Sequence, residues 1–359
     1  MRIVQILTTL SFGDAVSNDC LAIDKLLRDN GYDTRIIVEN LDKRIPKGTA
    51  SLIRGKIRLR DEDIVLYHLS TGTKLNKLIK DIPNRKFMIY HNVTPAHFFK
   101  DYNGATAKLC AQGREQAADL KDTFEAVMCD SDYNRQELAE MGYECKMTVR
   151  PILIPFEDYE KEIDHEVYDD LKSTGKKTVI FVGRIAPNKC QEDIIKLAYT
   201  YKKMYGDGAR FVLVGSSTGT KNYLIRLKSY ARILGLDLES DVVFTGQISF
   251  KGILAHYKAA DAFVCMSEHE GFCVPLVEAM KFEVPILAYD SCAVPGTLNG
   301  SGVLLDKKDM TKAAFFLHEL LEDEELRSNL IEAERTRLAD FSYENVSRIF
   351  MEQIKDFIG

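Results

Sequence analysis

The fold of this chain is decided by one segment, Ala262-Phe-Val-Cys-Met-Ser-Glu-His-Glu-Gly-Phe-Cys-Val-Pro-Leu-Val-Glu-Ala-Met280. Its first five residues form an apolar run typical of a buried strand, and Pro275 suits the first turn of a helix. A strand, a tight turn at Gly271 and a helix N-terminus make an anion site, because backbone N–H groups and the positive end of the helix dipole point at the turn. Glu270 and Glu278 would repel a bare phosphate, yet they suit a ligand whose phosphates lie between hydroxyl-rich groups. A nucleotide-sugar has this shape.

The spacing of the two acids supports a nucleotide-sugar site only together with the residues around them. Eight helical positions advance about 12 Å, which is enough for Glu270 and Glu278 to lie on either side of a diphosphate. On spacing alone, an ordinary strand–loop–helix with one capping and one solvated glutamate explains the pattern equally well. The intact run 270–280 favours the ligand site.

Short apolar runs alternate with amphipathic segments along the chain, which indicates βα units and mostly parallel sheets. We expect strands at 3–7, 34–38, 64–68, 86–90, 126–129 and 147–152, and again at 178–182, 211–214, 242–245, 262–266, 286–289 and 302–305. Helices are expected at 17–29, 74–79, 104–119, 132–141 and 342–357. The length of 359 residues suggests two domains. We place them at 1–155 and 178–341, with a linker at 156–177 and a terminal helix at 342–359.

The composition restricts the class of protein. A 45% hydrophobic content can fill two cores, and the net charge of −6 argues against nonspecific binding of nucleic acid. The eight cysteines are spread singly without a Cys-x-x-Cys spacing, so neither a zinc site nor a disulfide scaffold is indicated. No signal peptide is apparent, and no apolar run approaches the roughly 20 residues that span a bilayer. We expect a cytoplasmic protein, with peripheral attachment at the inner face of the cell membrane as an open alternative.

The segment around Glu270 resembles the Glu-x7-Glu signature of retaining family 4 glycosyltransferases. The resemblance continues through the C-terminal half, at Phe181–Lys189, Phe211–Gly215, Phe244–Gln247 and Tyr257–Asp261. The N-terminal half matches more loosely, at Gly13–Asp19, Tyr90–Pro95 and Asp130–Arg135. These three stretches look like a bacterial branch that builds surface polysaccharides from mannose- or rhamnose-type donors. The resemblance implies the α/β GT-B fold, with two facing Rossmann-like domains and a C-terminal helix that crosses back to the first domain.

The leaving diphosphate of such a donor must be stabilised by a metal or by fixed cations. Gly183 lets a phosphate approach the backbone after a strand, Arg184 offers a fork of donors, and Lys189 offers a point charge. By resemblance these cations replace a metal, so no metal site and no cofactor are expected. The run Asp61-Glu-Asp63 has the spacing of a metal motif, but it precedes a strand instead of following one, and we interpret it as a solvated turn.

The resemblance assigns catalysis to Arg184, Lys189, Glu270 and His91, with His91 bonded to the donor sugar; a structural histidine is the alternative. The donor contacts that it implies are Gly183, Gly215, Gln247, Ile248, Gly271, Phe272, Cys273, Val274 and Glu278. For Gly215 a plain loop is an equal alternative. Asp14 stands where many relatives carry paired glycines. Asp14 and Asn18 either orient an acceptor hydroxyl or cap a helix.

The expected function is retaining transfer of a hexose from a nucleoside-diphosphate sugar to a growing bacterial glycan or lipid-linked oligosaccharide. Alternatives are a UDP-hexose-dependent transferase and a non-catalytic GT-B subunit of a glycan assembly complex. A Rossmann oxidoreductase is disfavoured, because 8–18 lacks a Gly-x-Gly-x-x-Gly turn. The stretch Lys43–Arg60 interleaves seven cations with apolar residues. Such a basic amphipathic segment can contact anionic lipid or a lipid diphosphate, and a solvated basic face is the alternative.

Overall fold

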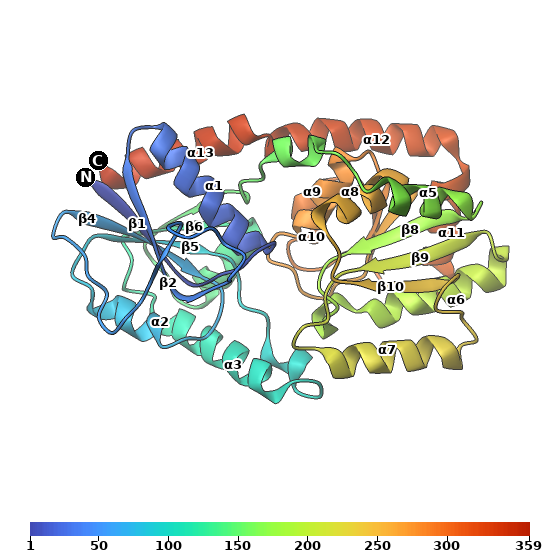
Figure 1. Cartoon of the computed structure of the whole chain (residues 1–359), viewed down its shortest axis with the longest axis horizontal. Helices are drawn as coiled ribbons and strands as arrows, with labels where there is room; N and C mark the ends of the chain where they lie inside the picture. The colour runs from blue at the N-terminus through green and yellow to red at the C-terminus, as the bar shows by residue number, and fades with distance from the viewer. The chain divides into compact units, whose positions relative to one another are not determined.

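The computed structural model describes all 359 residues, and the chain divides into two compact units. The first unit comprises residues 1–97, 105–155 and 341–359, and the second comprises 98–104 and 156–340 (Figure 1). Each unit is built on one parallel β-sheet with helices on both faces, which confirms the expected pair of Rossmann-like α/β units.

The first sheet has seven strands in the order β3-β2-β1-β4-β5-β6-β7, all paired in parallel. Its strands are β1 (Arg2–Leu10), β2 (Asp33–Leu41), β3 (Ser51–Leu52), β4 (Asp63–Leu69), β5 (Lys86–Tyr90), β6 (Ala126–Cys129) and β7 (Lys146–Val149). The helices of this part of the chain are α1 (Ala15–Asp29), α2 (Leu75–Leu78), α3 (Gly104–Asp119), α4 (Asp132–Glu140) and α13 (Tyr343–Ile358). Every strand expected from the sequence is present, whereas the two-residue β3 was not expected.

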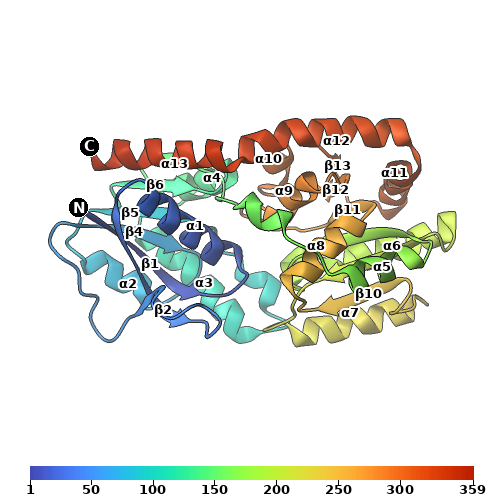
Figure 2. The same ribbon diagram turned by 45° about the horizontal axis from the view of Figure 1, so that its top comes forward.

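The first sheet has an apolar core on each face, because alternate strand residues point to opposite sides. Val65 and Tyr67 of β4 pack with residues of α2 and α3, whereas Ile64 and Leu66 pack with α1 and α13. The side chain of Ser342 caps α13 by accepting from Asn345 N at 3.3 Å. The expected terminal helix is thus confirmed, and it completes the core of the first unit (Figure 2).

The second sheet has six strands in the order β10-β9-β8-β11-β12-β13, again all parallel. Its strands are β8 (Lys177–Val182), β9 (Ala209–Val214), β10 (Val242–Gly246), β11 (Ala262–Cys265), β12 (Ile286–Tyr289) and β13 (Val303–Leu305). The helices are α5 (His165–Ser173), α6 (Gln191–Tyr205), α7 (Lys221–Ile233), α8 (Phe250–Ala259), α9 (Val274–Lys281), α10 (Val294–Leu298), α11 (Met310–Glu322) and α12 (Glu324–Leu338). Residues of α6, α7 and α11 fill the core on one face of the sheet. Residues 156–177, which the sequence suggested as a linker, lie in this unit.

The stretch Lys43–Arg60 is irregular apart from β3, and it is not an amphipathic element facing outward. Ile53, Ile57 and Leu59 pack against the core of the first unit instead. These three apolar side chains thus face the core, whereas Leu52 is exposed, and a lipid contact of this stretch stays a prediction. All seven cations are exposed: Lys43, Arg44, Lys47, Arg54, Lys56, Arg58 and Arg60. Nowhere in the chain is there a helix with the length and apolar character that crossing a membrane would require.

Candidate functional site

The second sheet reverses its strand order between β8 and β11, and open parallel sheets bind ligands in the crevice at such a reversal. From β8 the chain passes to Gly183 and Arg184, and from β11 it passes to the turn that precedes α9. The fold thereby brings the segment with Arg184 and Lys189 and the segment with Glu270 to neighbouring strand ends.

An ion pair joins these two segments. Lys189 Nζ donates to Glu270 Oε2 at 2.5 Å. Burial opposes the charge on Lys189, but the neighbouring Glu270 carboxylate outweighs burial and raises the pKa of the ammonium group. The lysine is therefore held as a cation at neutral pH, in a position where it can stabilise a developing anion.

Asn188 fixes the approach of the two segments. Its carbonyl oxygen accepts from Glu268 N at 2.9 Å, and its Nδ2 donates to the carbonyl oxygen of His269 at 3.1 Å. Two backbone groups of the turn are thus tied to the residue preceding Lys189. The sequence prediction did not include Asn188, although it lies inside the quoted motif 181–189.

The two glycines after β8 and β9 allow the strand ends to touch. A Cβ on Gly215 would lie 1.9 Å from the Gly183 carbonyl oxygen, so no other residue fits there. Gly183 N donates to Val214 O at 2.9 Å, and Ile185 N donates to Ser216 O at 2.9 Å. Gly215 is therefore required by backbone packing. A contact of either glycine with phosphate remains a prediction.

Arg184 supplies a second cation in the segment between β8 and Lys189. Its guanidinium is exposed and lies 5.8 Å from the centroid of the Phe99 ring. Its carbonyl oxygen accepts from Gln191 Nε2 at 3.1 Å, which fixes the backbone at this point. An exposed guanidinium on a fixed backbone is suited to binding a phosphate group.

Glu278 is held by two tyrosines that the sequence prediction missed. Tyr159 OH donates to one carboxylate oxygen and Tyr257 OH donates to the other, each at 2.6 Å. Burial raises the pKa of Glu278, and the two tyrosine donors act in the opposite direction. The carboxylate is thus fixed in place before any ligand arrives, which suits either a ribose contact or a purely structural role.

The turn between Glu270 and α9 is shaped by its backbone. Cys273 is the N-cap of α9 at φ 73°, in the left-handed region, and its side chain makes no capping bond. Thr297 Oγ1 donates to the carbonyl oxygen of Phe272 at 2.6 Å. The bond from Thr297 therefore fixes the backbone next to Gly271. Helix α9 starts at Val274 and has no acidic residue in its first turn.

Gln247 and Ile248 follow β10, the edge strand of the same sheet, and Gln247 is exposed.

His91 lies in the first unit, where strands β4 to β7 bring four charged or polar side chains together at their carboxyl ends. His91 Nδ1 lies 2.8 Å from Asp130 Oδ2, and His91 Nε2 lies 2.9 Å from His68 Nδ1. Asp130 also accepts from Arg150 Nη2 at 3.3 Å, and Arg150 makes two bonds to Asp19, at 2.9 and 2.7 Å. Both ring nitrogens of His91 are engaged. The predicted bond from His91 to a donor sugar therefore requires the ring to turn away from His68, and it stays a prediction.

The hydrogen-bond partners fix the protons of the two histidines. Gln5 Nε2 donates to Cys20 O at 3.1 Å, so Gln5 Oε1 faces His68 Nε2 at 3.0 Å and accepts its proton. Asp130 accepts the proton of His91 Nδ1. One further proton lies between the rings, so the pair carries one positive charge. Burial lowers the pKa of His68; burial also opposes charge on His91, but Asp130 outweighs it and raises the pKa of His91, which places the charge there. With Arg150 and two aspartates the buried network is neutral.

The predicted acceptor residues lie at the start of α1. Asp14 is the N-cap, and it accepts from Ser17 N at 3.0 Å and from Ser17 Oγ at 2.6 Å. This is the capping role that the sequence left open. Asn18 is exposed in the first turn, and an acceptor contact there is still a prediction.

In the run 61–63, Asp63 is buried and paired with Arg2 at 2.6 Å, which corrects its interpretation as part of a solvated turn.

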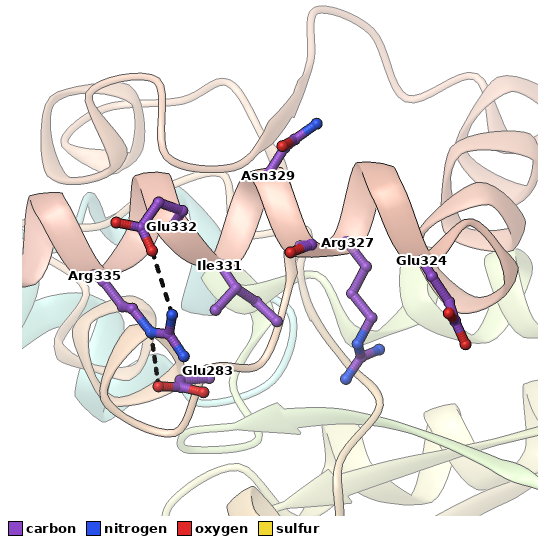
Figure 3. A pocket seen from close by; sticks show the side chains of 8 residues that line it. Glu283, Glu324, Arg327, Asn329, Ile331, Glu332 and Arg335 are labelled. Atoms are coloured by element: carbon purple, nitrogen blue, oxygen red, sulfur yellow. Dashed lines mark hydrogen bonds and ion pairs between the residues drawn. The ribbon is translucent and has the colours of Figure 1, made fainter.

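A hollow of about 400 Å³ on the surface of α12 is a separate feature, shown in Figure 3. Arg335 donates to Glu283 at 2.8 Å and to Glu332 at 3.3 Å, and Arg327 donates to Asp261 O at 2.7 Å. None of the predicted donor contacts lines this hollow. Because its arginines already have partners within the unit, we assign no ligand to it.

Comparison with known proteins adds family information to this geometry. Residues 163–337, a little under half of the chain, match the family of glycosyl transferases, group 1. The chain is 24% identical over 178 residues to the amylovoran biosynthesis glycosyltransferase AmsD of Erwinia amylovora, covering 49% of this chain and 48% of that protein. It is 32% identical over 117 residues to a GDP-mannose-dependent alpha-mannosyltransferase of Mycolicibacterium smegmatis, covering 33% and 26%. The chain thus spans about half the length of these relatives or less.

The folds of solved structures match the fold of this chain over nearly its whole length. The crystal structure of Anabaena Alr3699/HepE in complex with UDP-glucose superposes with a TM-score of 0.78 at 15% identity, covering 99% of this chain and 100% of that one. WaaG, a glycosyltransferase involved in lipopolysaccharide biosynthesis, gives 0.71 at 14% identity, covering 96% and 97%. These likenesses confirm the expected GT-B fold. They show the fold alone, whereas the likeness to glycosyl transferases of group 1 is that of residues 163–337.

Proposed function

We propose that this protein is a retaining glycosyltransferase that moves a hexose from a nucleoside-diphosphate sugar to a growing bacterial surface glycan or a lipid-linked acceptor. The observation that carries the proposal is the Lys189–Glu270 ion pair at the strand-order reversal of the second sheet. The pair lies within the residues that match the group 1 family. Its lysine is part-exposed, so a ligand can reach it.

In the proposed reaction, Lys189 and Arg184 stabilise the charge that builds on the leaving diphosphate as the glycosidic bond breaks. Glu270 holds Lys189 in place before the reaction and accepts hydrogen bonds from the hexose. The departing phosphate takes the proton of the acceptor hydroxyl on the same face of the sugar, so no strong protein base is required. Fixed cations do the work that a divalent metal does in other transferases.

Two classes of donor are considered. The name of the mycobacterial relative, which is 32% identical over 117 residues, specifies GDP-mannose, so we favour a mannose- or rhamnose-type donor. A UDP-hexose is the second candidate, because the Anabaena structure holds UDP-glucose. A relative named alpha-monoglucosyldiacylglycerol synthase, from Streptococcus pneumoniae, is 28% identical over 172 residues and covers 46% of this chain and 37% of that protein.

The exposed cations of residues 43–60 form a surface that suits the negatively charged group of a lipid-linked acceptor. Arg44 is paired with Asp42 at 2.7 Å, and the remaining six cations form no ion pair within the chain. We propose that this surface contacts a lipid diphosphate or anionic headgroups at the inner face of the cell membrane. The attraction would be mainly electrostatic, since Ile53, Ile57 and Leu59 pack inward and Leu52 is the one large apolar side chain of the stretch that is exposed.

The proposed function is tested with purified protein and a panel of GDP-mannose, GDP-rhamnose, UDP-glucose and UDP-GlcNAc. Hydrolysis or transfer should occur with one donor class and should survive excess EDTA. Activity that is lost with chelator and restored by Mg²⁺ or Mn²⁺ would contradict the metal-free reaction. A chain that binds a nucleotide in thermal-shift assays but turns over no donor with any acceptor would favour the non-catalytic subunit.

A further inference from the structure

The second unit contains four cysteines, and all of them lie close to the turn that carries Glu270. Cys265 ends β11, Cys273 starts α9, Cys190 follows Lys189, and Cys292 Sγ lies 3.3 Å from the Glu268 carbonyl oxygen. Only one set brings two thiols and a carboxylate together. The Sγ atoms of Cys265 and Cys273 and a carboxylate oxygen of Glu270 all lie within 4.8 Å of one another.

We propose that Cys265, Cys273 and Glu270 form a binding site for a thiophilic divalent cation such as Zn²⁺. Thiolate sulfur and carboxylate oxygen are preferred zinc ligands, at about 2.3 and 2.1 Å from the metal. Tetrahedral ligands at those distances lie roughly 3.5 Å apart, so side-chain rotation suffices to reach them from the observed spacing. All three residues are buried, which shields the metal bonds from water.

The surroundings of the two thiols are compatible with this site. Cys265 Sγ donates to Ser267 Oγ at 3.3 Å, and it lies within 4.8 Å of Cys273 Sγ. Metal binding would then replace two thiol protons with one divalent ion.

Charge balance is preserved in this exchange. The site now holds Lys189 and Glu270, with no net charge. Adding a divalent cation and removing two thiol protons also adds no net charge, so the buried site acquires no unpaired ion. Because the cation takes a carboxylate oxygen of Glu270, it weakens the bond that holds Lys189. We therefore expect the ion to oppose donor turnover; this consequence rests on the proposed function, whereas the metal site does not.

The two other groups of potential ligands also contain a carboxylate that is paired with a cation, as Glu270 is with Lys189. Asp193 and Glu268 lie beside Cys190, but Lys308 bonds both, at 2.7 and 2.8 Å. Asp19 lies beside His68 and His91, but it is paired with Arg150. A divalent ion would have to compete with a cation in all three groups, but only the proposed site offers two thiols.

The test measures metal binding directly on EDTA-stripped, full-length protein. Titration with Cd²⁺, a spectroscopic substitute for Zn²⁺, should give one ion per chain with a thiolate-to-cadmium charge-transfer band, and Zn²⁺ should displace it. Cys273→Gly is the most suitable variant, because it removes the thiol and glycine tolerates φ 73°. It should weaken binding by more than about 100-fold, beyond the loss typical of an outer-sphere partner. Cys265→Ser should do the same.

Cys190→Ser is the matched control, and it should bind Cd²⁺ as wild type does. Wild-type protein that binds no Cd²⁺, or Cys273→Gly protein that keeps the band and the affinity, would overturn the proposed site. In a parallel assay Zn²⁺ should inhibit donor turnover by the wild type but not by Cys265→Ser. If the ion binds and no donor is turned over by any variant, the proposed function fails while the metal site stands.

Discussion

The two sheets place ionised side chains at equivalent positions, beyond the carboxyl ends of parallel strands, but they expose them differently. In the first unit the side chains of Arg150 and Asp19 are 0% exposed, and those of His91 and Asp130 are 1% and 2% exposed. In the second unit Lys189 is 22% exposed and its partner Glu270 is 8% exposed. The first set is a closed network whose charges satisfy one another. The second is a pair with one side open to a ligand.

This difference in exposure indicates that the buried network serves stability and the open pair serves ligand binding. A sealed, neutral network stabilises the fold only as long as every member is present, because a lost partner leaves a buried charge unpaired. An open pair tolerates the loss of a member more easily, because water can solvate the remaining group. The open pair is therefore where a ligand's charge can be bound, and the predictions below test whether the division holds.

The largest effect is expected for Asp19→Asn in the sealed network. Arg150 would lose its bidentate partner and the network would gain a net positive charge, at a cost of about 3–5 kcal/mol in the free energy of unfolding. Urea denaturation followed by circular dichroism measures this cost. Asp29→Asn on the same helix is the control, since its exposed pair with Lys25 should contribute less than about 0.5 kcal/mol. Equal costs for the two variants would contradict the sealed network.

Lys189→Ala should have the opposite effect, with a large loss of turnover and little loss of stability. Turnover should fall by roughly two orders of magnitude, equivalent to about 3 kcal/mol of transition-state stabilisation, while stability and donor affinity change little. Steady-state kinetics with the cognate donor provide the comparison. Lys203→Ala, an exposed lysine on α6, should retain wild-type kinetics. Near wild-type turnover for Lys189→Ala would remove this residue from the reaction.

The two glutamates of the donor site should differ in what they bind. Glu278→Ala should weaken nucleoside-diphosphate binding by about tenfold, the effect of losing one hydrogen bond to a ligand, if Glu278 contacts the ribose. Glu270→Ala should spare diphosphate binding and abolish transfer, because free diphosphate lacks the hexose. Calorimetry of both variants measures the difference. Tyr159→Phe is the control, because it keeps the Glu278 carboxylate and removes one donor to it. Equal weakening by the two alanine variants would leave the pair as a structural feature of the helix entry.

A third environment is a buried acid without an ion pair, and its effect should appear as a dependence of stability on pH. Glu334 on α12 is 0% exposed, and burial raises its pKa to about 9. The folded protein then binds a proton that the unfolded chain releases near pH 4.5. The free energy of unfolding should consequently fall as the pH rises from 5 to 9, by roughly 1 kcal/mol per pH unit.

Glu334→Gln should abolish this slope, because the amide does not ionise. The measurement is the urea midpoint of wild type and variant at pH 6, 7 and 8. Glu325→Gln, exposed on the same helix, should keep the wild-type slope. A slope that survives in Glu334→Gln would show that other groups cause it.

Much of the fold could be predicted from the sequence, because buried parallel strands are continuous apolar runs. The limits of β5, β6, β12 and α3 were predicted to the residue. β3 was missed, since two residues carry no periodic signal. Ile53, Ile57 and Leu59 were assigned to the wrong side, because alternation shows that a face exists but not which partner covers it.

The site could be predicted only where its residues are close in sequence. The motif containing Glu270 and the motif containing Lys189 were recognisable separately, and each motif predicted its own strand–turn–helix. The hydrogen bond from Tyr159 to Glu278 joins positions 119 residues apart, and nothing in either segment indicates it. Cys265 and Cys273 are separated by a turn whose shape, with Cys273 at φ 73°, decides that the thiols meet. A separation of eight residues does not indicate such a meeting.

The way the chain is shared between its two units has a consequence for protein engineering. The boundaries fall after residues 97, 104, 155 and 340, so the chain changes unit four times. A cut at residue 155 would deprive the first unit of α13, and Ile64, Leu66 and Phe87 would lose the apolar side chains that cover them. A chimera that exchanges donor specificity should therefore transplant 156–340 together with 98–104 and keep the host's own last nineteen residues, 341–359. Exchanging simple halves would expose two incomplete cores.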